Sequence, residues 1–143
     1  MSAATIAHLL GGTKVLRTTV KSDLDFIKMI QAGLPVSVVD SLVRQGILTL
    51  VEIERLVIPR RTLAHRKKKR QPLSREESDR LARIARIMTL AAETLGSQDK
   101  AGLWMRRPNR ALRGARPLDL LETDGGAQVV EAILGRVSHG VFS

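Results

Sequence analysis

The sequence predicts an all-α protein in which a helix-turn-helix lobe is followed by a smaller helical lobe. The composition favours this class, because Leu, Ala, Arg, Glu and Lys are good helix formers and only 2% of the residues are aromatic. Apolar residues recur with a helical period through residues 74–95, and capping residues stand where the periodic segments begin. With 43% apolar residues, the chain can bury a core of aliphatic side chains.

The 143 residues suit one domain or two small lobes. We divide the chain into an N-terminal arm over residues 1–21, a helix-turn-helix lobe over residues 22–96 and a second lobe over residues 97–143. The first segment contains Gly11 and Gly12 but no sustained period. We therefore expect an arm that becomes ordered, if at all, in a dimer or a complex.

Two short helices are predicted first. Ser22 is placed to cap a helix over residues 23–31, whose first turn carries acidic residues that favour the positive end of the helix dipole. Pro35 suits the first turn of the next helix, which runs to Gln45. The apolar positions assigned to these two helices are Leu24, Ile27, Met29, Ile30, Val36, Val39, Leu42 and Val43.

A capped helix and a basic helix come next. Thr49 and Glu52 form a capping box for a helix that runs to about Val57. Pro59 ends this helix and opens the following one, over residues 60–69.

A long helix closes the first lobe. Ser74 and Glu77 form a second capping box, from which the helix runs to Leu95 before Gly96 stops it. Its apolar stripe is the clearest in the chain and consists of Leu81, Ile84, Ala85, Met88, Ala91, Ala92 and Leu95.

The second lobe is predicted to contain a short helix around Trp104, a loop and a final amphipathic helix over residues 125–137. Pro108 and Pro117 are expected to shape the loop.

Positive charge is concentrated in residues 60–70, which read RRTLAHRKKKR and contain no acidic residue. The whole chain has a formal net charge of +10. Residues 60–86 hold eleven basic and three acidic residues, a net charge of +8, whereas residues 117–143 hold one basic and four acidic residues, a net charge of −3. A surface that serves only solubility would mix the signs more evenly. The asymmetry indicates a polyanionic partner, either nucleic acid or an anionic membrane surface.

Helix, tight turn and basic helix follow one another over residues 49–69, as in a helix-turn-helix that places its second helix in the major groove of DNA. Leu63 is the expected apolar anchor of this second helix. The residues predicted to contact DNA are Arg60, Arg61, Thr62, His65, Arg66, Lys67, Lys68 and Lys69. The alternative that residues 67–70 are only a solvated linker stays open. RNA is less favoured, because the segment has no aromatic side chain on which bases stack.

Nothing in the sequence favours catalysis. His8, His65 and His139 are far apart and not at metal-ligand spacing, Cys is absent, and there is no phosphate-binding glycine loop or nucleophile motif. We predict a binding protein with no catalytic residue, no metal and no cofactor. The sequence shows no signal peptide and no apolar run of membrane-spanning length, so we expect a cytoplasmic protein that does not enter a membrane.

An ordered series of motifs marks the second lobe. The motifs are WMRRPN at 104–109, AL at 111–112, Gly114, PLDLL at 117–121, Gly125-Gly126 and LGRV at 134–137. In this order and spacing they resemble the toxin-binding domain of the Xre/MbcA/ParS-type antitoxins. GLP at 33–35 and RTLAHR at 61–66 resemble the helix-turn-helix lobe of the same family, so the resemblance covers residues 25–143.

The resemblance implies an antitoxin of a bacterial type II toxin–antitoxin pair, whose toxin is a RES-domain protein that degrades NAD. Such antitoxins form homodimers, occlude the toxin's active site with their C-terminal domain and repress their own operon. Residues 22–96 are then expected to bind operator DNA and to dimerise, and residues 97–143 to bind the toxin. The main alternative is a stand-alone helix-turn-helix regulator without a toxin partner. A membrane-surface adaptor is less favoured, because the basic segment lacks the large apolar residues of an interfacial helix.

The residues predicted to bind the toxin are Trp104, Arg106, Arg107, Asn109, Arg136, His139, Gly140, Val141, Phe142 and Ser143. We hypothesise that the tail 140–143 enters the toxin's NAD site, since it offers an aromatic side chain and a terminal carboxylate. A frayed end, or Phe142 folded back on the antitoxin, is an equal alternative. A lone Trp such as Trp104 belongs to a core more often than to a contact surface. The arginines of residues 106–116 face the toxin, DNA or water, and the pattern does not decide among them.

The helix over residues 74–95 is the best candidate for the dimer interface. Ile87 and Leu90 lie off its main stripe and widen its apolar surface, which suits contact with two partners. The alternative is that the stripe is used wholly inside the monomer.

Overall fold

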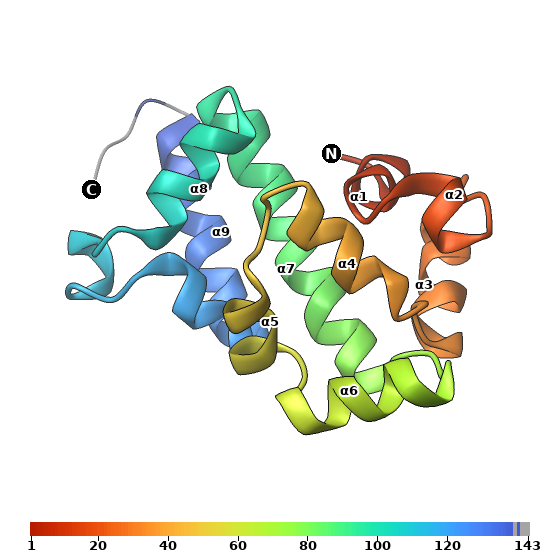
Figure 1. Cartoon of the computed structure of the whole chain (residues 1–143). Helices are drawn as coiled ribbons and strands as arrows, with labels where there is room; N and C mark the ends of the chain where they lie inside the picture. The colour runs from red at the N-terminus through yellow and green to blue at the C-terminus, as the bar shows by residue number, and fades with distance from the viewer. Residues whose placement is uncertain (139, 141–143) are drawn as a thin grey trace. The chain divides into compact units, whose positions relative to one another are not determined.

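The computed structural model describes residues 1–138 and 140, and over these residues the chain forms helices and no strand, which confirms the all-α prediction. Two compact units are present, residues 1–82 and residues 83–143 (Figure 1). The division falls within the long helix α7 (Arg75–Leu95) rather than after it at the predicted residue 96. The second half of this helix therefore belongs to the second unit.

Residues 1–21 do not form the predicted arm. They begin with two short helices, α1 (Ala3–Leu9) and α2 (Gly12–Leu16), joined at Gly11, whose φ of 123° suits a residue without Cβ. The helices pack against the next two helices of the unit and bury Leu10 and Leu16, among others. The prediction of an arm is wrong because each helix is too short to show a period in the sequence.

The helices α3 (Asp23–Ala32) and α4 (Ser37–Arg44) lie close to their predicted positions. Ser22 caps α3 as predicted, since its Oγ accepts a backbone N–H of the first turn at 3.1 Å. Two of the apolar positions assigned to α3 lie on the surface: Leu24 is 58% exposed and Ile27 is 51% exposed.

The helices α5 (Leu50–Leu56) and α6 (Arg60–Lys69) are joined by a tight turn, as predicted (Figure 1). The Thr49 N–H donates to Glu52 Oε1 at 2.9 Å, and the Glu52 N–H donates to Thr49 Oγ1 at 3.1 Å, so the first capping box is confirmed. Leu63 is buried and anchors α6, also as predicted.

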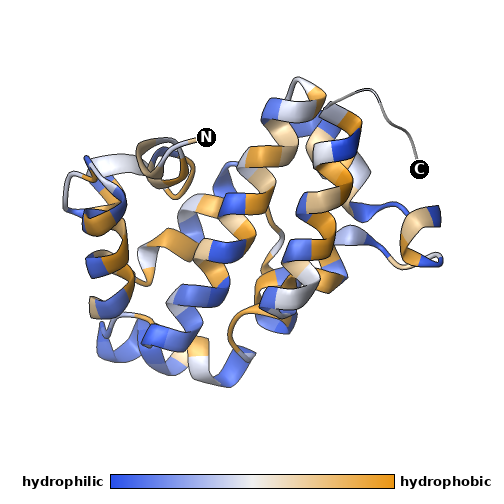
Figure 2. Cartoon of the chain, turned by 180° about the vertical axis from the view of Figure 1, so that it is seen from behind, coloured by the Kyte–Doolittle hydropathy of each residue, from blue (hydrophilic) through white to orange (hydrophobic). Residues whose placement is uncertain are grey.

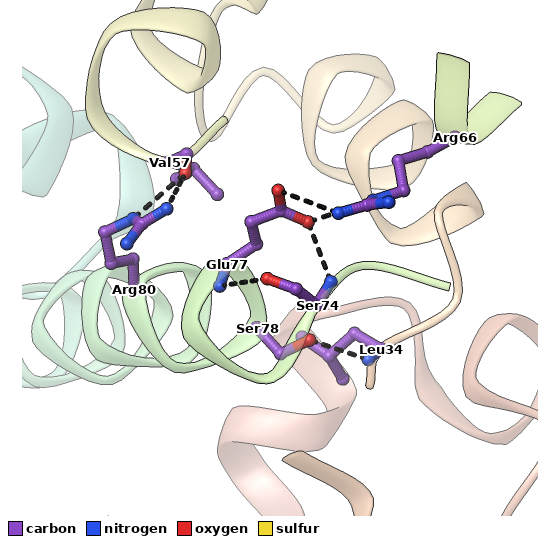
Figure 3. Close-up of polar contacts among 7 residues, drawn as sticks. All are labelled: Leu34, Val57, Arg66, Ser74, Glu77, Ser78 and Arg80. Atoms are coloured by element: carbon purple, nitrogen blue, oxygen red, sulfur yellow. Dashed lines mark hydrogen bonds and ion pairs between the residues drawn. The ribbon is translucent and has the colours of Figure 1, made fainter. Parts of the chain in front are cut away.

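The start of α7 is fixed by hydrogen bonds from two directions (Figure 3). The Ser74 N–H donates to Glu77 Oε1 at 2.7 Å and the Glu77 N–H donates to Ser74 Oγ at 3.1 Å, which confirms the second capping box. The Leu34 N–H donates to Ser78 Oγ at 2.8 Å, and the Leu73 N–H donates to the Leu34 carbonyl at 2.9 Å. These bonds tie the connection between α3 and α4 to the long helix.

The apolar stripe of α7 is used inside the monomer. Its buried members are Leu81, Ile84, Ala85, Met88 and Ala91. Ile87, which lies off the stripe, is buried as well, whereas Leu90 is half-buried. The buried members of the main stripe thus agree with its use inside the monomer, and a dimer interface on α7 stays a prediction.

The second unit continues after α7 with α8 (Gln98–Arg106), two 3-10 segments η1 (Arg110–Leu112) and η2 (Pro117–Glu122), and α9 (Asp124–Ser138). Both α8 and α9 pack against η2. A Cβ on Gly126 of α9 would overlap the Leu120 carbonyl oxygen, so this approach requires glycine. Hydrophobic and hydrophilic residues alternate along the helices of both units, the pattern of amphipathic helices (Figure 2).

Within the described residues, no single helix has the length and apolar character to span a membrane. The pair α3 and α4 meets the length and composition requirement only jointly, across a bend of 117°.

Candidate functional site

The outer surface of α6 presents most of the side chains predicted to contact DNA. Leu63 anchors the inner side of the helix, so the charged side chains project outward. The exposed residues are Arg60, Arg61, His65, Lys67, Lys68, Lys69 and Arg70, while Thr62 and Arg66 are half-buried. Hydrogen bonds hold the turn before α6 and the Thr49–Glu52 capping box at the start of α5. The helix-turn-helix that carries this basic surface is therefore held in place by its own backbone.

Arg66 differs from its neighbours because it turns towards α7 (Figure 3). Its Nε lies 3.2 Å from Glu77 Oε1 and its Nη2 lies 3.4 Å from Glu77 Oε2. The side chain of Arg66 is 24% exposed and that of Glu77 only 8%. Arg66 therefore positions α6 against α7, and its contact with DNA stays a prediction.

The carboxyl group of Glu77 is kept ionised by its partners. Burial acts to raise its pKa, but the hydrogen bond from the Ser74 N–H and the Arg66 guanidinium outweigh burial, so the pKa lies below its ordinary value. The ion pair with Arg66 and the N-terminal cap of α7 therefore both depend on the charged carboxylate of Glu77.

Lys67 Nζ lies 3.0 Å from Asp40 Oδ1 of α4. Both side chains are well exposed, at 40% and 59%, and an exposed pair of this kind contributes about 0–1 kcal/mol. Lys67 can therefore exchange this partner for a phosphate at little cost.

Arg80 supports the turn of the helix-turn-helix and was missed by the sequence reasoning. Its Nε and Nη2 donate to the Val57 carbonyl at 3.0 and 2.8 Å, at the C-terminal end of α5 (Figure 3). Its position in the sequence could have indicated this role. Arg80 lies three residues after Glu77, and residues three apart share a helix face, so both side chains point towards the helix-turn-helix.

A second candidate site is a surface hollow of about 220 Å³ in the second unit. Its lining consists of Trp104, Arg107, Pro108, Asn109, Arg110, Ile133 and Val137. Three residues predicted to bind the toxin thus come together between α8, the following loop and α9. Trp104 is half-buried at this hollow, so it is neither a fully buried core residue nor a free surface residue.

Five arginines lie in residues 106–116, a segment without acidic residues. Two of them have partners within the unit: Arg116 forms a bidentate pair with Asp119 at 2.9 and 3.0 Å, and Arg106 donates to the Gly102 carbonyl at 3.2 Å. The other three, which are Arg107, Arg110 and Arg113, are exposed. Arg107 and Arg110 line the hollow.

Asn109 has a clear local role. Its Oδ1 accepts the Ala111 N–H at 2.9 Å, and its backbone N–H donates to the Ala115 carbonyl at 2.9 Å. It shapes the arginine-bearing loop, and its contact with a toxin stays a prediction.

Arg136 is exposed in the last turns of α9, and Gly140 is exposed beyond them. The other predicted tail residues, His139, Val141, Phe142 and Ser143, lie outside the described residues.

No group of three metal-binding side chains of the His, Cys, Asp or Glu type occurs in the part of the chain that the structure describes. His8 and His65 are both exposed.

The chain thus combines a capped helix-turn-helix, whose second helix is basic and exposed, with a second helical unit that carries its own hollow. Residues 25–86 match the family model of the antitoxin Xre-like helix-turn-helix domain. Residues 90–140 match that of the antitoxin Xre/MbcA/ParS C-terminal toxin-binding domain.

Curated relatives agree with both matches. The chain is 35% identical over 119 residues to Antitoxin Xre of Pseudomonas putida, covering 83% of this chain and 74% of the relative. It is 39% identical over 122 residues to Antitoxin Xre of Yersinia enterocolitica, covering 84% and 80%. The chain belongs to the Xre/MbcA/ParS family of antitoxins, which are binding proteins and not enzymes.

A solved structure also resembles this chain. It comes from the crystal structure of the Mycobacterium tuberculosis MbcT–MbcA toxin–antitoxin complex, with a TM-score of 0.56 and 29% identity, and the match covers 76% of this chain and 96% of the solved chain.

Proposed function

We propose that this chain neutralises a RES-type, NAD-degrading toxin through its second unit and represses its own operon by binding operator DNA through α6. The observation that carries the proposal is the position of the arginine-lined hollow. It lies within residues 90–140, the segment that matches the family's toxin-binding domain. Arginine side chains beside a half-buried Trp are the residue types that dominate protein–protein binding energy.

The toxin partner is tested by enzyme kinetics. The toxin encoded beside this chain is purified, and its consumption of NAD is followed with increasing amounts of the antitoxin. We expect NAD loss to stop at a fixed molar ratio. Unchanged NAD loss, or a neighbouring protein that does not consume NAD, would leave a DNA-binding regulator as the function.

The hollow is tested in the same assay with Arg107→Glu/Arg110→Glu. Loss of two exposed interface arginines is expected to weaken toxin binding by about tenfold or more. Lys100→Glu is the matched control, since Lys100 is exposed in the same unit but does not line the hollow. Equal neutralisation by all three proteins would rule out the hollow as a toxin contact.

The tail is tested by deletion of residues 140–143. If the tail occupies the toxin's NAD site, the shortened antitoxin binds the toxin but no longer stops NAD loss. Full neutralisation by the shortened chain would end the tail hypothesis and leave the hollow as the contact. Binding to operator DNA is expected to be unaffected in either case.

A homodimer remains part of the proposal. Its test is the molar mass of the purified chain in solution, measured by light scattering at several concentrations. A monomer at all concentrations would contradict it.

A further inference from the structure

The helices α1 and α2 lie outside both matched family domains, which begin at residue 25 and end at residue 140. They nevertheless belong to the first unit, where they pack on α3 and α4. They also carry exposed positive charge, in Lys14 and Arg17. Whether α1 and α2 extend the basic surface of α6 depends on where this charge lies relative to that helix.

One hollow connects α2 with the C-terminal end of α6. It measures about 640 Å³, and its charged lining residues are Arg17, Asp40, Lys67 and Arg70. Arg17 follows α2, Asp40 belongs to α4, and Arg70 is the residue at which α6 ends. Three basic side chains, one after α2 and two at the end of α6, therefore line the same hollow, and Asp40 is the acidic residue in its lining.

A neighbouring hollow of about 510 Å³ continues the charge. Its lining includes His8, Lys14, Arg17 and Arg44, and no acidic residue. Arg17 lines both hollows, so the basic strip is continuous from Lys67 and Arg70 to Lys14 and Arg44.

These cations are available to a ligand. Lys14, Arg17 and Arg44 are exposed and form no ion pair with any residue in ranges 1–138 and 140. The one carboxylate of the strip, Asp40, pairs with Lys67 on the open surface. Among residues 1–138 and 140, no other acidic side chain pairs with a cation of the strip.

The backbone gives an independent argument. Arg17 and Arg70 have φ values of 60° and 53°, the left-handed conformation that usually takes Gly or Asn at the end of a helix. Both positions line the same hollow. Glycine would relieve the backbone strain at both positions, and arginine instead places a cation at each of them.

We infer that this strip, defined by Lys14, Arg17, Arg44, Lys67 and Arg70, binds the DNA phosphate backbone beside the contacts of α6. The inference rests on DNA binding as proposed above and extends it to helices outside the family's helix-turn-helix domain. A membrane surface fits less well, because the apolar lining residues Val15 and Val36 are themselves half-buried and leave no large side chain to insert.

The test uses fluorescence anisotropy of the full chain with the duplex from its own promoter and with a scrambled duplex, over a range of salt concentrations. Arg17→Asn removes the charge and suits the left-handed backbone, so the fold is retained. We expect it to weaken binding to both duplexes equally and to lower the salt slope by about 1, the signature of one lost phosphate contact. Arg17→Lys should restore most of the slope. Lys14→Gln/Arg44→Gln should lower it further.

The outcomes separate this inference from the proposed function. If the wild-type chain does not bind the promoter duplex, DNA binding itself fails. If the wild type binds but the Arg17→Asn and Lys14→Gln/Arg44→Gln variants show unchanged affinity and salt slope, only the strip is overturned. Displacement of the duplex by vesicles containing phosphatidylserine would also overturn it and assign the strip to a membrane.

Asp40 provides a test by gain of affinity. Asp40→Asn removes the carboxylate of the strip and releases Lys67, so we expect tighter binding and a steeper salt slope. Glu122→Gln is the matched control, because it removes an exposed carboxylate from the second unit. Weaker or unchanged binding by Asp40→Asn, relative to the control, would contradict the inference.

Discussion

Glu77 joins α6 to the start of α7 through one carboxylate. It accepts the Ser74 N–H and pairs with Arg66, and it does so from a site where its side chain is 8% exposed. Its cap was predictable, because Ser74 lies three residues before it in the sequence. Its partner was not, because Arg66 is eleven residues away and only the folded chain brings the two together.

The pKa of Glu77 predicts how stability responds to acid. Since the folded pKa lies below the unfolded value, the carboxylate stabilises the fold at pH values above the unfolded pKa, and this stabilisation is lost as the pH falls through the folded pKa. We expect Glu77→Gln to cost about 1–3 kcal/mol at pH 7 and to flatten the decline in stability below about pH 5. The free energy of unfolding in urea, measured from pH 7 to pH 3, checks both effects.

Glu76→Gln is the control for this experiment, because Glu76 is the exposed neighbour in the same turn. If Glu77→Gln and wild type lose stability in parallel as the pH falls, Glu77 is not the group responsible.

At the scale of elements, the sequence predicted the three helices whose N-terminal caps it identified. Ser22, Thr49 and Ser74 were identified as caps, and all three accept the expected backbone N–H. The pair α1 and α2 was missed, because helices of seven and five residues are too short for a period to emerge. Their packing depends on contacts with α3 and α4 that no local pattern reports.

The packing of α9 on η2 depends on Gly126. A methyl group at this position would meet the Leu120 backbone, which cannot move away as a flexible side chain could. We expect Gly126→Ala to destabilise the fold by about 1–3 kcal/mol, the usual cost of overpacking. Thermal or urea unfolding of the full chain measures it.

The adjacent glycine supplies the matched comparison. Gly125 is also in the first turn of α9, but a Cβ there meets nothing within 4 Å. Gly125→Ala should therefore leave stability unchanged or raise it by about 0.5–1 kcal/mol. Equal effects of the two substitutions would show that helix propensity, and not the contact with Leu120, decides the outcome.

At the scale of the whole chain, positive charge is concentrated in α6 of the first unit and in residues 106–116 of the second unit. The charge of α6 was predictable as a site because its cations are consecutive in the sequence. The hollow at Trp104 was predictable only in part, because Ile133 and Val137 join it from α9 and residue spacing does not reveal that meeting. The sequence also could not show which arginines of residues 106–116 have hydrogen-bond partners inside the second unit. The structure shows that Arg106 and Arg116 do.

Because the basic surface of α6 and the hollow at Trp104 belong to different units and share no residue, we expect that the two proposed activities can be lost independently. Arg61→Glu/Lys68→Glu reverses two exposed charges of α6 and is expected to weaken DNA binding by about tenfold or more, since each contact to DNA is worth about 1–3 kcal/mol. Neutralisation of the toxin should be unchanged. Arg107→Glu/Arg110→Glu should do the reverse, and the combined variant should show both losses without extra coupling, because substitutions at sites that share no partner residue add.

Anisotropy with promoter DNA and NAD consumption by the toxin, measured on all four proteins, give the complete comparison. The unfolding midpoint of each variant must match the wild type, so that a lost activity reports a lost contact and not a lost fold. A charge reversal in α6 that released the toxin at unchanged stability would mean that toxin and DNA share one surface. The chain would then act as a switch between two competing partners, and DNA binding would fall as the toxin is added.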